Sequence, residues 1–332
     1  MTRGGLVESR HEIAACAADA GGRIVLAYGD VERPVYVRSA AKPFIAAALV
    51  RTGTADRFGF GARELATIAA SHNGEPAHVK VVEGILATIG LSAADLQCGA
   101  HAPAFEPAAQ ELAARGEPYT ALHNNCSGKH AGILAMCVHL GLDHRGYLAA
   151  GHAVQQTILS FCARMVDEDV ARLTLGIDGC GIPVFATPLY RAARAFARLA
   201  TLEGLDEQDR VALVRVREAM TAEPWYVAGT GRLDTAIMQA TQGRIVCKAG
   251  AEGVHGDALL GLGLGLALKV LDGARRAAAP AVVSVLTEVG ALGAAERAAL
   301  ARFAAADVRN VAGRVVGCIE MMPDTIEAGA TS

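Results

Sequence analysis

Strand-like segments lie near both ends of this sequence, and the long stretch between them has the pattern of helices. Runs rich in β-branched and aliphatic residues predict strands over 23–28, 34–37, 244–248 and 310–319. Apolar residues spaced three and four apart predict helices over 62–71, 76–90, 129–141, 152–166 and 188–202. We therefore predict an α+β fold in which strands from both ends form one sheet.

The same distribution predicts how the chain is organised. Residues 1–60 and 190–332 are expected to form the sheet with its flanking helices. Residues 61–189 are expected to form a mostly helical inserted region. The tail after Pro323 is expected to be loosely held.

The composition excludes several classes of protein. The net charge is −3 and no run of Lys and Arg occurs, so neither nucleic acid nor an anionic membrane surface is an expected partner. The longest apolar run, 258–268, is too short to cross a bilayer, and the charged start is unlike a signal peptide. In such a chain, eight cysteines favour reduced thiols that serve a metal or catalysis over disulfides. We expect a soluble cytoplasmic protein.

The apolar side chains are mostly small. Hydrophobic residues make up 52% of the chain but aromatic residues only 5%, so we expect a closely packed core of alanine and aliphatic side chains. Gly261, Gly263 and Gly265 are spaced as in a dinucleotide-binding loop, but they lie within an apolar stretch of helical pattern. We predict that they allow close helix packing.

Three short strings place residues of catalytic type in a meaningful order. They are Ser39-Ala-Ala-Lys42, Ser71-His72-Asn73 and Lys248-Ala-Gly, which together are typical of enzymes that attack a carbonyl with a lysine-activated serine. A helix that begins at Ser39 would place Lys42 on the same face, within reach of the serine hydroxyl. Lysine acts as a base only when burial or a nearby cation destabilises its ammonium, and Lys248 would supply that second charge. We predict Ser39 as nucleophile and Lys42 as its base.

The second string has a structural and a functional interpretation. As structure, it is a helix C-terminus with Gly74 in the left-handed conformation. As function, Ser71 would deliver a proton to the departing amine and Asn73 would hold a substrate amide or carboxylate. Both interpretations are compatible. After the third string, Glu252 is a weaker candidate for receiving a substrate α-ammonium group.

Two glycine-bearing loops carry a cysteine each. Cys126 lies in Asn-Asn-Cys-Ser-Gly-Lys-His before a predicted helix, and Cys180 lies in Asp-Gly-Cys-Gly. The pair is compatible with a metal site, a redox pair or two unrelated buried thiols, because two sulfurs alone do not complete a zinc site. Cys126 is also a possible nucleophile, since a helix N-terminus lowers the pKa of a thiol.

Taken together, these strings resemble the bacterial L-asparaginase II family of the inducible Rhizobium type. The matching segments are 38–43, 71–74, 124–130, 178–181 and 248–253, with further matches in 3–11 and 229–235. The resemblance runs nearly from end to end. Ile45 departs from it, because glutamine follows Lys-Pro-Phe in many members. Ile45 lies outside the matching segments that carry the reactive side chains.

The resemblance implies both a fold and a reaction. The implied fold is similar to serine β-lactamases and glutaminases, and the implied reaction converts L-asparagine to L-aspartate and ammonia. Two Ser–Lys pairs are implied, Ser39 with Lys42 and Ser71 with Lys248. A homodimer is also implied.

The resemblance further implies a zinc ion beside the substrate. Its ligands would be Cys126, Lys129 and Cys180, and Asp178 would hold Lys129 or a metal-bound water. Substrate-binding roles are expected for residues in or beside the matching strings: Arg38, His72, Asn73, His130, Asp178 and Glu252.

Other functions share part of this pattern. A β-lactamase or DD-peptidase uses the same three strings but works outside the cytoplasm, and a glutaminase substrate differs by one methylene. A non-enzyme alternative is a zinc or thiol sensor that uses Cys126 and Cys180 on an inactive hydrolase scaffold. The presence of both serines and both lysines favours an active hydrolase.

Overall fold

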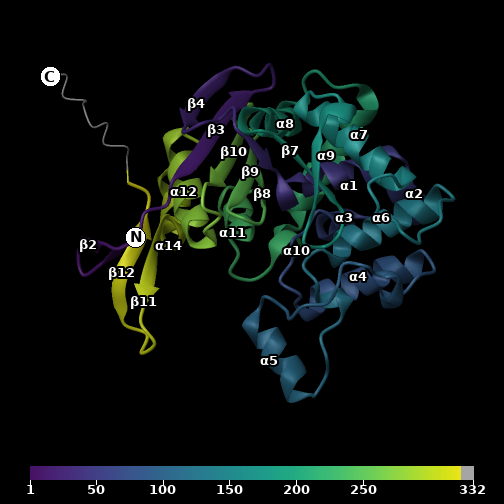
Figure 1. Cartoon of the computed structure of the whole chain (residues 1–332), viewed down its shortest axis with the longest axis horizontal. Coiled ribbons are helices and arrows are strands. Elements are labelled where there is room, and N and C mark those ends of the chain that lie inside the picture. The colour runs from purple at the N-terminus through teal and green to yellow at the C-terminus, as the bar shows by residue number, and fades with distance from the viewer. Residues whose placement is uncertain (323–332) are drawn as a thin grey trace.

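A five-stranded antiparallel sheet joins segments from the two ends of the chain, in the computed structural model that describes residues 1–322. Its order is β4-β3-β10-β9-β8. The strands span Ile13–Asp19 (β3), Ile24–Tyr28 (β4), Ile245–Ala249 (β8), Val254–Leu259 (β9) and Leu264–Val270 (β10). Figure 1 shows β3 and β4, in purple, beside the green strands β8 to β10. The prediction of an α+β fold with one sheet from both ends is confirmed.

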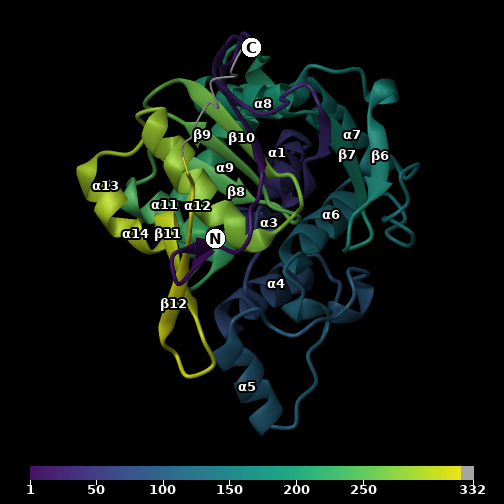
Figure 2. The ribbon, with the colours of Figure 1, turned by 60° about the vertical axis from the view of Figure 1, so that its left-hand side comes forward.

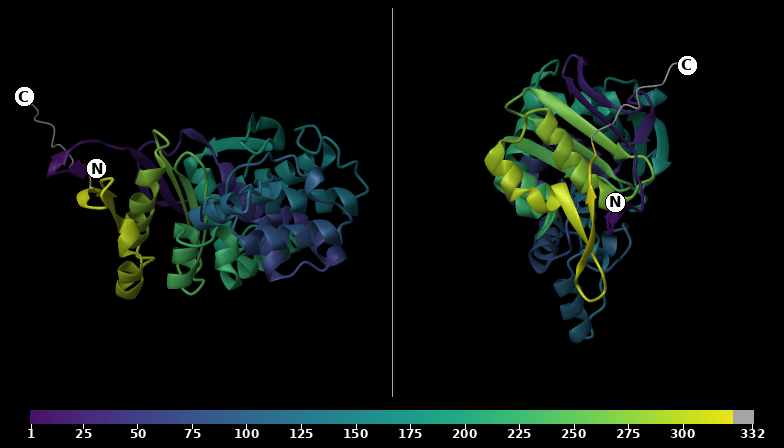
Figure 3. Two further views of the ribbon diagram at one scale, coloured as in Figure 1. Left: turned by 90° about the horizontal axis from the view of Figure 1, so that it is seen from below. Right: turned by 90° about the vertical axis from the view of Figure 1, so that its left-hand side faces the viewer.

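Helices cover this sheet on both faces, as the edge-on view in Figure 3 shows. Helix α8 (Leu189–Thr201) packs on β3, β9 and β10, and α12 (Arg275–Glu288) packs on β9 and β10 from the other layer. Every residue of β9 is accordingly buried. The close approach of α8 depends on Gly265, where a Cβ atom would lie 2.0 Å from the carbonyl oxygen of Ala193.

The helical placement of the glycine run was therefore wrong. Gly261 and Gly263 lie in the turn between β9 and β10, and Gly265 lies within β10. Alanine, leucine and glycine alternate here without the β-branched residues that mark most strands. A short apolar run of this kind does not distinguish a buried strand from a buried helix. The expected close packing does occur, between strand and helix.

The five predicted helices are present with ends that differ by a few residues. They are α3 (Ala62–Ile68), α4 (Pro76–Thr88), α6 (Ser127–His139), α7 (Ala153–Val166) and α8. Further helices are α1 (Lys42–Arg51), α2 (Thr54–Phe58), α5 (Glu106–Ala114), α9 (Glu207–Ala222), α10 (Pro224–Ala228) and α11 (Leu233–Ala240). Single 3-10 turns are η1 (Arg38–Ala41), η2 (Ala93–Asp95), η3 (Ala121–His123) and η4 (Val170–Arg172).

Two smaller sheets complete the fold. The first has the order β5-β7-β6 and joins Pro34–Tyr36 (β5) to Thr174–Ile177 (β6) and Pro183–Pro188 (β7). The mostly helical region 61–189 thus supplies two strands, β6 and β7, which are drawn in teal in Figure 2.

The second small sheet has the order β11-β12-β1-β2 and brings the chain ends together. Its strands span Thr2–Arg3 (β1), Leu6–Val7 (β2), Ala305–Arg309 (β11) and Val315–Glu320 (β12), next to α13 (Ala294–Ala299) and α14 (Ala301–Ala304). The strand predicted over 310–319 therefore begins later, because 310–314 forms the turn between β11 and β12. The predicted loose tail, 323–332, lies outside the described residues.

Alanine and aliphatic residues dominate the buried core, as the composition predicts. In the part of the chain that the structure describes, none of the helices combines the length and apolar character needed to cross a bilayer.

Candidate active site

Ser39 lies where the chain turns from a strand into a helix. Strand β5 ends at Tyr36, η1 covers Arg38–Ala41, and α1 begins at Lys42. The expected helix start at Ser39 is thus a tight 3-10 turn, and the α-helix begins three residues later. Arg38 has a φ of +50°, a conformation that non-glycine residues seldom adopt and that often occurs at functional sites. This turn fixes the direction in which the Ser39 and Lys42 side chains leave the backbone.

Lys42 is 1% exposed and is surrounded by acceptors. Its Nζ donates to the carbonyl oxygen of Ala70 (2.5 Å), to Ser71 Oγ (2.9 Å) and to Cys126 Sγ (3.1 Å). Burial lowers the pKa of the Lys42 amine, against the opposite effect of Cys126. The hydrogen-bonded serine–lysine pair is thus Lys42 with Ser71, a different pairing from the two that the resemblance implies.

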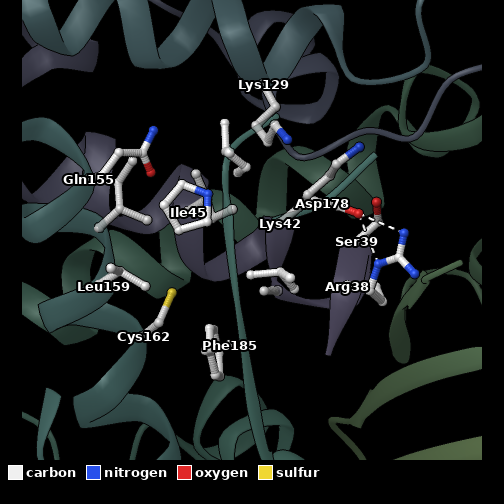
Figure 4. Close-up of a pocket in the computed structure, with 15 residues that line it drawn as sticks. Arg38, Ser39, Lys42, Ile45, Lys129, Gln155, Leu159, Cys162, Asp178 and Phe185 are labelled. Atoms are coloured by element: carbon white, nitrogen blue, oxygen red, sulfur yellow. Dashed lines mark hydrogen bonds and ion pairs between the residues drawn. The ribbon is translucent and has the colours of Figure 1, made fainter. Parts of the chain in front are cut away.

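Ser39 and Lys42 line one small cavity (Figure 4). Its space of about 20 Å³ is enough for about one water molecule. Ser39 lies beside Arg38 and Asp178 on one side of it, and Leu159 and Cys162 lie on the opposite side. Within residues 1–322 the Ser39 hydroxyl forms no hydrogen bond, so its Oγ is available to a ligand at this cavity.

Asp178 joins Arg38, the residue before Ser39, to the loop that carries Cys180. Its Oδ1 accepts hydrogen bonds from Arg38 Nε at 2.8 Å and from the backbone N–H of Gly179 at 2.8 Å. Although burial opposes it, Lys129 and Arg38 hold the pKa of Asp178 below its usual range. This ion pair holds the Arg38 side chain at the rim of the cavity (Figure 4).

Three of the predicted residues meet in one buried cluster: Cys126, Lys129 and Cys180. The two thiol groups are hydrogen-bonded to each other, and Lys129 Nζ lies 2.7 Å from Cys180 Sγ. The hydrogen bond from Cys180 and the nearby lysines hold the pKa of Cys126 well below its usual range, so Cys126 has thiolate character. Donating that bond raises the pKa of Cys180. Burial would lower the pKa of Lys129, but the two sulfurs outweigh it and raise the pKa.

The Ser71-His72-Asn73 string forms a loop beyond α3, which ends at Ile68 rather than at the predicted position 71. Gly74 has a φ of +73°, and a Cβ there would lie 2.8 Å from the His123 carbonyl oxygen. The left-handed turn expected at Gly74 is therefore present, although it closes this loop rather than the helix.

His72 and Asn73 have internal partners. His72 is fully buried: its Nδ1 accepts from the Gly74 N–H (3.1 Å), and its Nε2 lies 3.0 Å from Ser127 Oγ. Asn73 Oδ1 accepts from Arg232 at 2.9 Å, and its amide donates to the Thr230 carbonyl oxygen at 3.0 Å. His72 thus holds the loop in place, whereas Asn73 joins it to the segment before α11.

The two other predicted substrate-binding residues lie in contrasting environments. His130 is buried, its Nδ1 lies 2.6 Å from Tyr147 Oη, and its Nε2 has no partner among residues 1–322. Glu252 is exposed in the turn between β8 and β9, with a φ of +61°. Among the described residues, no hydrogen bond connects the Glu252 carboxylate to another predicted site residue.

Lys248 lies on β8, as predicted, and is fully buried. Its Nζ donates to the Ala249 carbonyl oxygen at 2.6 Å and lies 3.6 Å from Asp234 Oδ2. Burial lowers the pKa of Lys248 to about 8, and the charge of Lys42 contributes to this direction. Lys248 is therefore within reach of neutrality near physiological pH.

A hydrogen-bonded chain of two buried aspartates and a buried histidine lies beside Lys248, and it was not predicted from the sequence. Asp234 Oδ1 lies 3.3 Å from His255 Nε2, and His255 Nδ1 lies 3.0 Å from Asp257 Oδ2. All three side chains are buried. His255 and Asp257 are two positions apart on β9 and so share a face, but this spacing alone does not reveal the partner that α11 supplies.

Glu75, Thr230 and Arg232 were likewise not assigned a role. Glu75 accepts hydrogen bonds at 2.8 Å from both the backbone N–H and the hydroxyl of Thr230. A Cβ at Gly229, whose φ is +111°, would lie 2.5 Å from Glu75 Oε1. The sequence signal for these residues was the resemblance of segment 229–235 to the family. In the structure, Thr230 and Arg232 of this segment are hydrogen-bonded to Asn73.

Two solved structures of low similarity match most of the chain. A protein titled Mglu in its native form is 18% identical over 87% of this chain and 67% of its own, with a TM-score of 0.44. A β-lactamase from Mycobacterium bovis is 14% identical over 85% of this chain and 96% of its own, with a TM-score of 0.40. No curated protein matches the sequence.

A family model gives a much fuller match. The model described as L-asparaginase II matches residues 1–321, which contain every predicted site residue. The five segments that carried the resemblance all lie within this match. In the structure, four of them come together around Lys42 and Lys129, and they contribute Ser39, Ser71, Cys126 and Cys180. The chain therefore belongs to the L-asparaginase II family.

Proposed function

We propose that the protein hydrolyses L-asparagine to L-aspartate and ammonia through an acyl-enzyme on Ser39. The family supports an amidohydrolase. The observation that carries the choice of nucleophile is the position of Lys42, which lines the cavity with Ser39 and is hydrogen-bonded to Ser71 on its other side. Ser39 has the free hydroxyl, and Ser71 has the one already engaged.

In the first step, Ser39 Oγ attacks the side-chain amide carbon and its proton passes to Lys42. This requires a neutral amine, which burial of Lys42 favours. The backbone N–H of Ser39 has no acceptor within residues 1–322 and is a donor for the developing oxyanion. The C–N bond then breaks as Ser71, hydrogen-bonded to Lys42, passes a proton to the departing ammonia. Lys248 supports this relay, and water then hydrolyses the ester.

Zinc belongs to the proposal as a bound group. The donor set of Cys126, Cys180 and Lys129 matches the sulfur and nitrogen ligands of zinc, and the three groups already contact one another in a buried cluster. The proton that Cys180 donates to Cys126 and the proton that Lys129 donates to Cys180 would leave on binding. A zinc ion held there would supply positive charge that orients the substrate.

The homodimer that the resemblance implies and the cytoplasmic location expected from the composition also join the proposal. All eight cysteines are free thiols in the structure, as is typical of a reducing compartment. Light scattering of the purified protein measures the oligomeric state directly, and a mass of one chain would exclude the dimer.

Ammonia release from L-asparagine and L-glutamine tests the function. Wild-type protein should release ammonia from asparagine, and Ser39→Ala should abolish both this activity and any trapped acyl adduct in mass spectrometry. An adduct that survives in Ser39→Ala and disappears in Ser71→Ala would reverse the two serine roles. Release from neither substrate would exclude the amidohydrolase proposal.

A further inference from the structure

The cations in and beside the predicted site differ in whether they are bonded to an acidic or thiol group. Four of them are paired with an acidic or thiol group: Arg38 with Asp178, Lys42 with Cys126, Lys129 with Cys180, and Lys248 with Asp234. Arg232 forms no ion pair with any residue of 1–322. The charge of Asp234 acts on Arg232, but the Asp234 carboxylate is engaged by Lys248 and His255. Because buried or partly buried charges are normally paired, an arginine with no anion bonded to it is unusual.

Arg232 is held firmly in this unpaired position. It immediately precedes α11 and is partly buried, and NH1 donates to Asn73 Oδ1 at 2.9 Å. Asn73 is itself held by Thr230, which Glu75 holds in turn. A guanidinium has five N–H donors in a rigid fork, so most of its donors remain available to a ligand.

Arg232 is bonded to the loop that carries Ser71, and its charge acts on Lys248. Asn73 follows Ser71 by two residues, and the charge of Arg232 contributes to the low pKa of Lys248. The cavity beside Ser39 holds only about one water molecule, so it has no room for the charged end of an amino acid. A ligand whose amide lies at Ser39 must place its charged end elsewhere.

We propose that Arg232, held in place by Asn73, binds the α-carboxylate of the substrate and so restricts the enzyme to amides that carry this group. The inference rests on the proposed function, because it requires an amino-acid amide at Ser39. A carboxylate accepts two parallel hydrogen bonds from a guanidinium, which gives both affinity and orientation. Arg232 would thereby set how far the amide lies from the carboxylate.

A pair of amides tests this directly. L-Asparagine and 3-aminopropionamide share the amide and the amine, but only asparagine has the α-carboxylate. We expect Arg232→Gln to lower kcat/KM for asparagine by about 100-fold, the loss typical of a charge-assisted hydrogen bond in a buried site, and to change that for 3-aminopropionamide less than about threefold. Arg275→Gln is the matched control, since Arg275 is exposed and its charge lies near Arg232.

Product binding gives a second readout that does not depend on turnover. L-Aspartate should inhibit wild type but bind about 100-fold more weakly to Arg232→Gln, whereas β-alanine, which lacks the α-carboxylate, should bind both equally. Equal losses for both amides, or for both products, would overturn the assignment and leave Arg232 a structural role. A wild type without asparaginase activity would instead refute the proposed function.

Discussion

At the scale of single residues, Asp234 controls the charge of Lys248. Although burial opposes it, Lys248 and His255 hold the pKa of Asp234 well below its usual range, so Asp234 is charged. Its carboxylate raises the pKa of Lys248 against the larger lowering by burial. In Asp234→Asn this support is lost and the pKa of Lys248 falls below about 8. Because a lysine accepts a proton in a relay only in its neutral form, the rising limb of the pH profile of kcat/KM should move to lower pH.

Asp257→Asn is the control for this pH profile. Asp257 contacts His255 but not Lys248, and burial raises its pKa, so asparagine resembles its protonated form. The limb should move less in Asp257→Asn than in Asp234→Asn. If the rising limb of the pH profile stays in place or moves to higher pH in Asp234→Asn, Lys248 takes no part in the rate-controlling proton transfer.

Metal content is also decided by individual side chains. In the proposal, Cys126→Ser removes a sulfur ligand, and loss of one ligand should lower zinc affinity by several orders of magnitude. We expect zinc near one ion per chain in wild type and close to none in Cys126→Ser after dialysis, measured by elemental analysis. Cys137→Ala is the matched control, because Cys137 is buried on the same helix but does not contact the cluster. Equal zinc in all three proteins would exclude this site.

At the scale of the element, the packing of α8 on β10 depends on one missing side chain. A Cβ at Gly265 would lie 2.0 Å from the Ala193 carbonyl oxygen and 2.1 Å from the Ala197 nitrogen, both backbone atoms that cannot rotate away. Gly265→Ala should therefore lower the free energy of unfolding by about 3 kcal/mol. Gly261→Ala, where a Cβ meets nothing within 4 Å, should change it by less than about 1 kcal/mol in denaturant titrations. Similar losses in both variants would contradict this packing.

The elements also show where prediction from sequence succeeds and where it stops. Amphipathic helices such as α7 follow from their spacing, but β3 has the sequence Ile-Ala-Ala-Cys-Ala-Ala-Asp, which shows no apolar–polar alternation and has a single β-branched residue at its first position. Its pairing with β10 on one side and β4 on the other makes it a strand.

In the site, the spacing of Ser39 and Lys42 predicts that both side chains lie at one cavity, as the structure shows. The hydrogen bond of Lys42 with Ser71 depends on the 3-10 turn before α1 and on a loop from α3, which spacing does not encode.

At the scale of the whole molecule, the two chain ends contribute unequally to the fold. The first strands, β1 and β2, belong only to the outer sheet, where β1 pairs with β12. Strand β3 instead lies inside the main sheet, bonded to β10 over Ile13–Asp19 and to β4 on its other side. Its five central residues are buried. Removing β3 would expose the edge of β10 and the alanine-lined face under α8.

Two truncations distinguish these contributions. Deleting residues 1–8 removes β1 and β2, and should leave asparaginase activity in place with a loss of no more than about 5 °C in Tm. Deleting residues 1–22 also removes β3, and the chain should lose its cooperative thermal transition, because β8, β9 and β10 then lack the strands that complete their sheet. Circular dichroism during heating, with ammonia release on the same samples, measures both. A cooperative transition in the longer deletion would show that the C-terminal strands form a stable sheet alone, and the sheet would not need both chain ends.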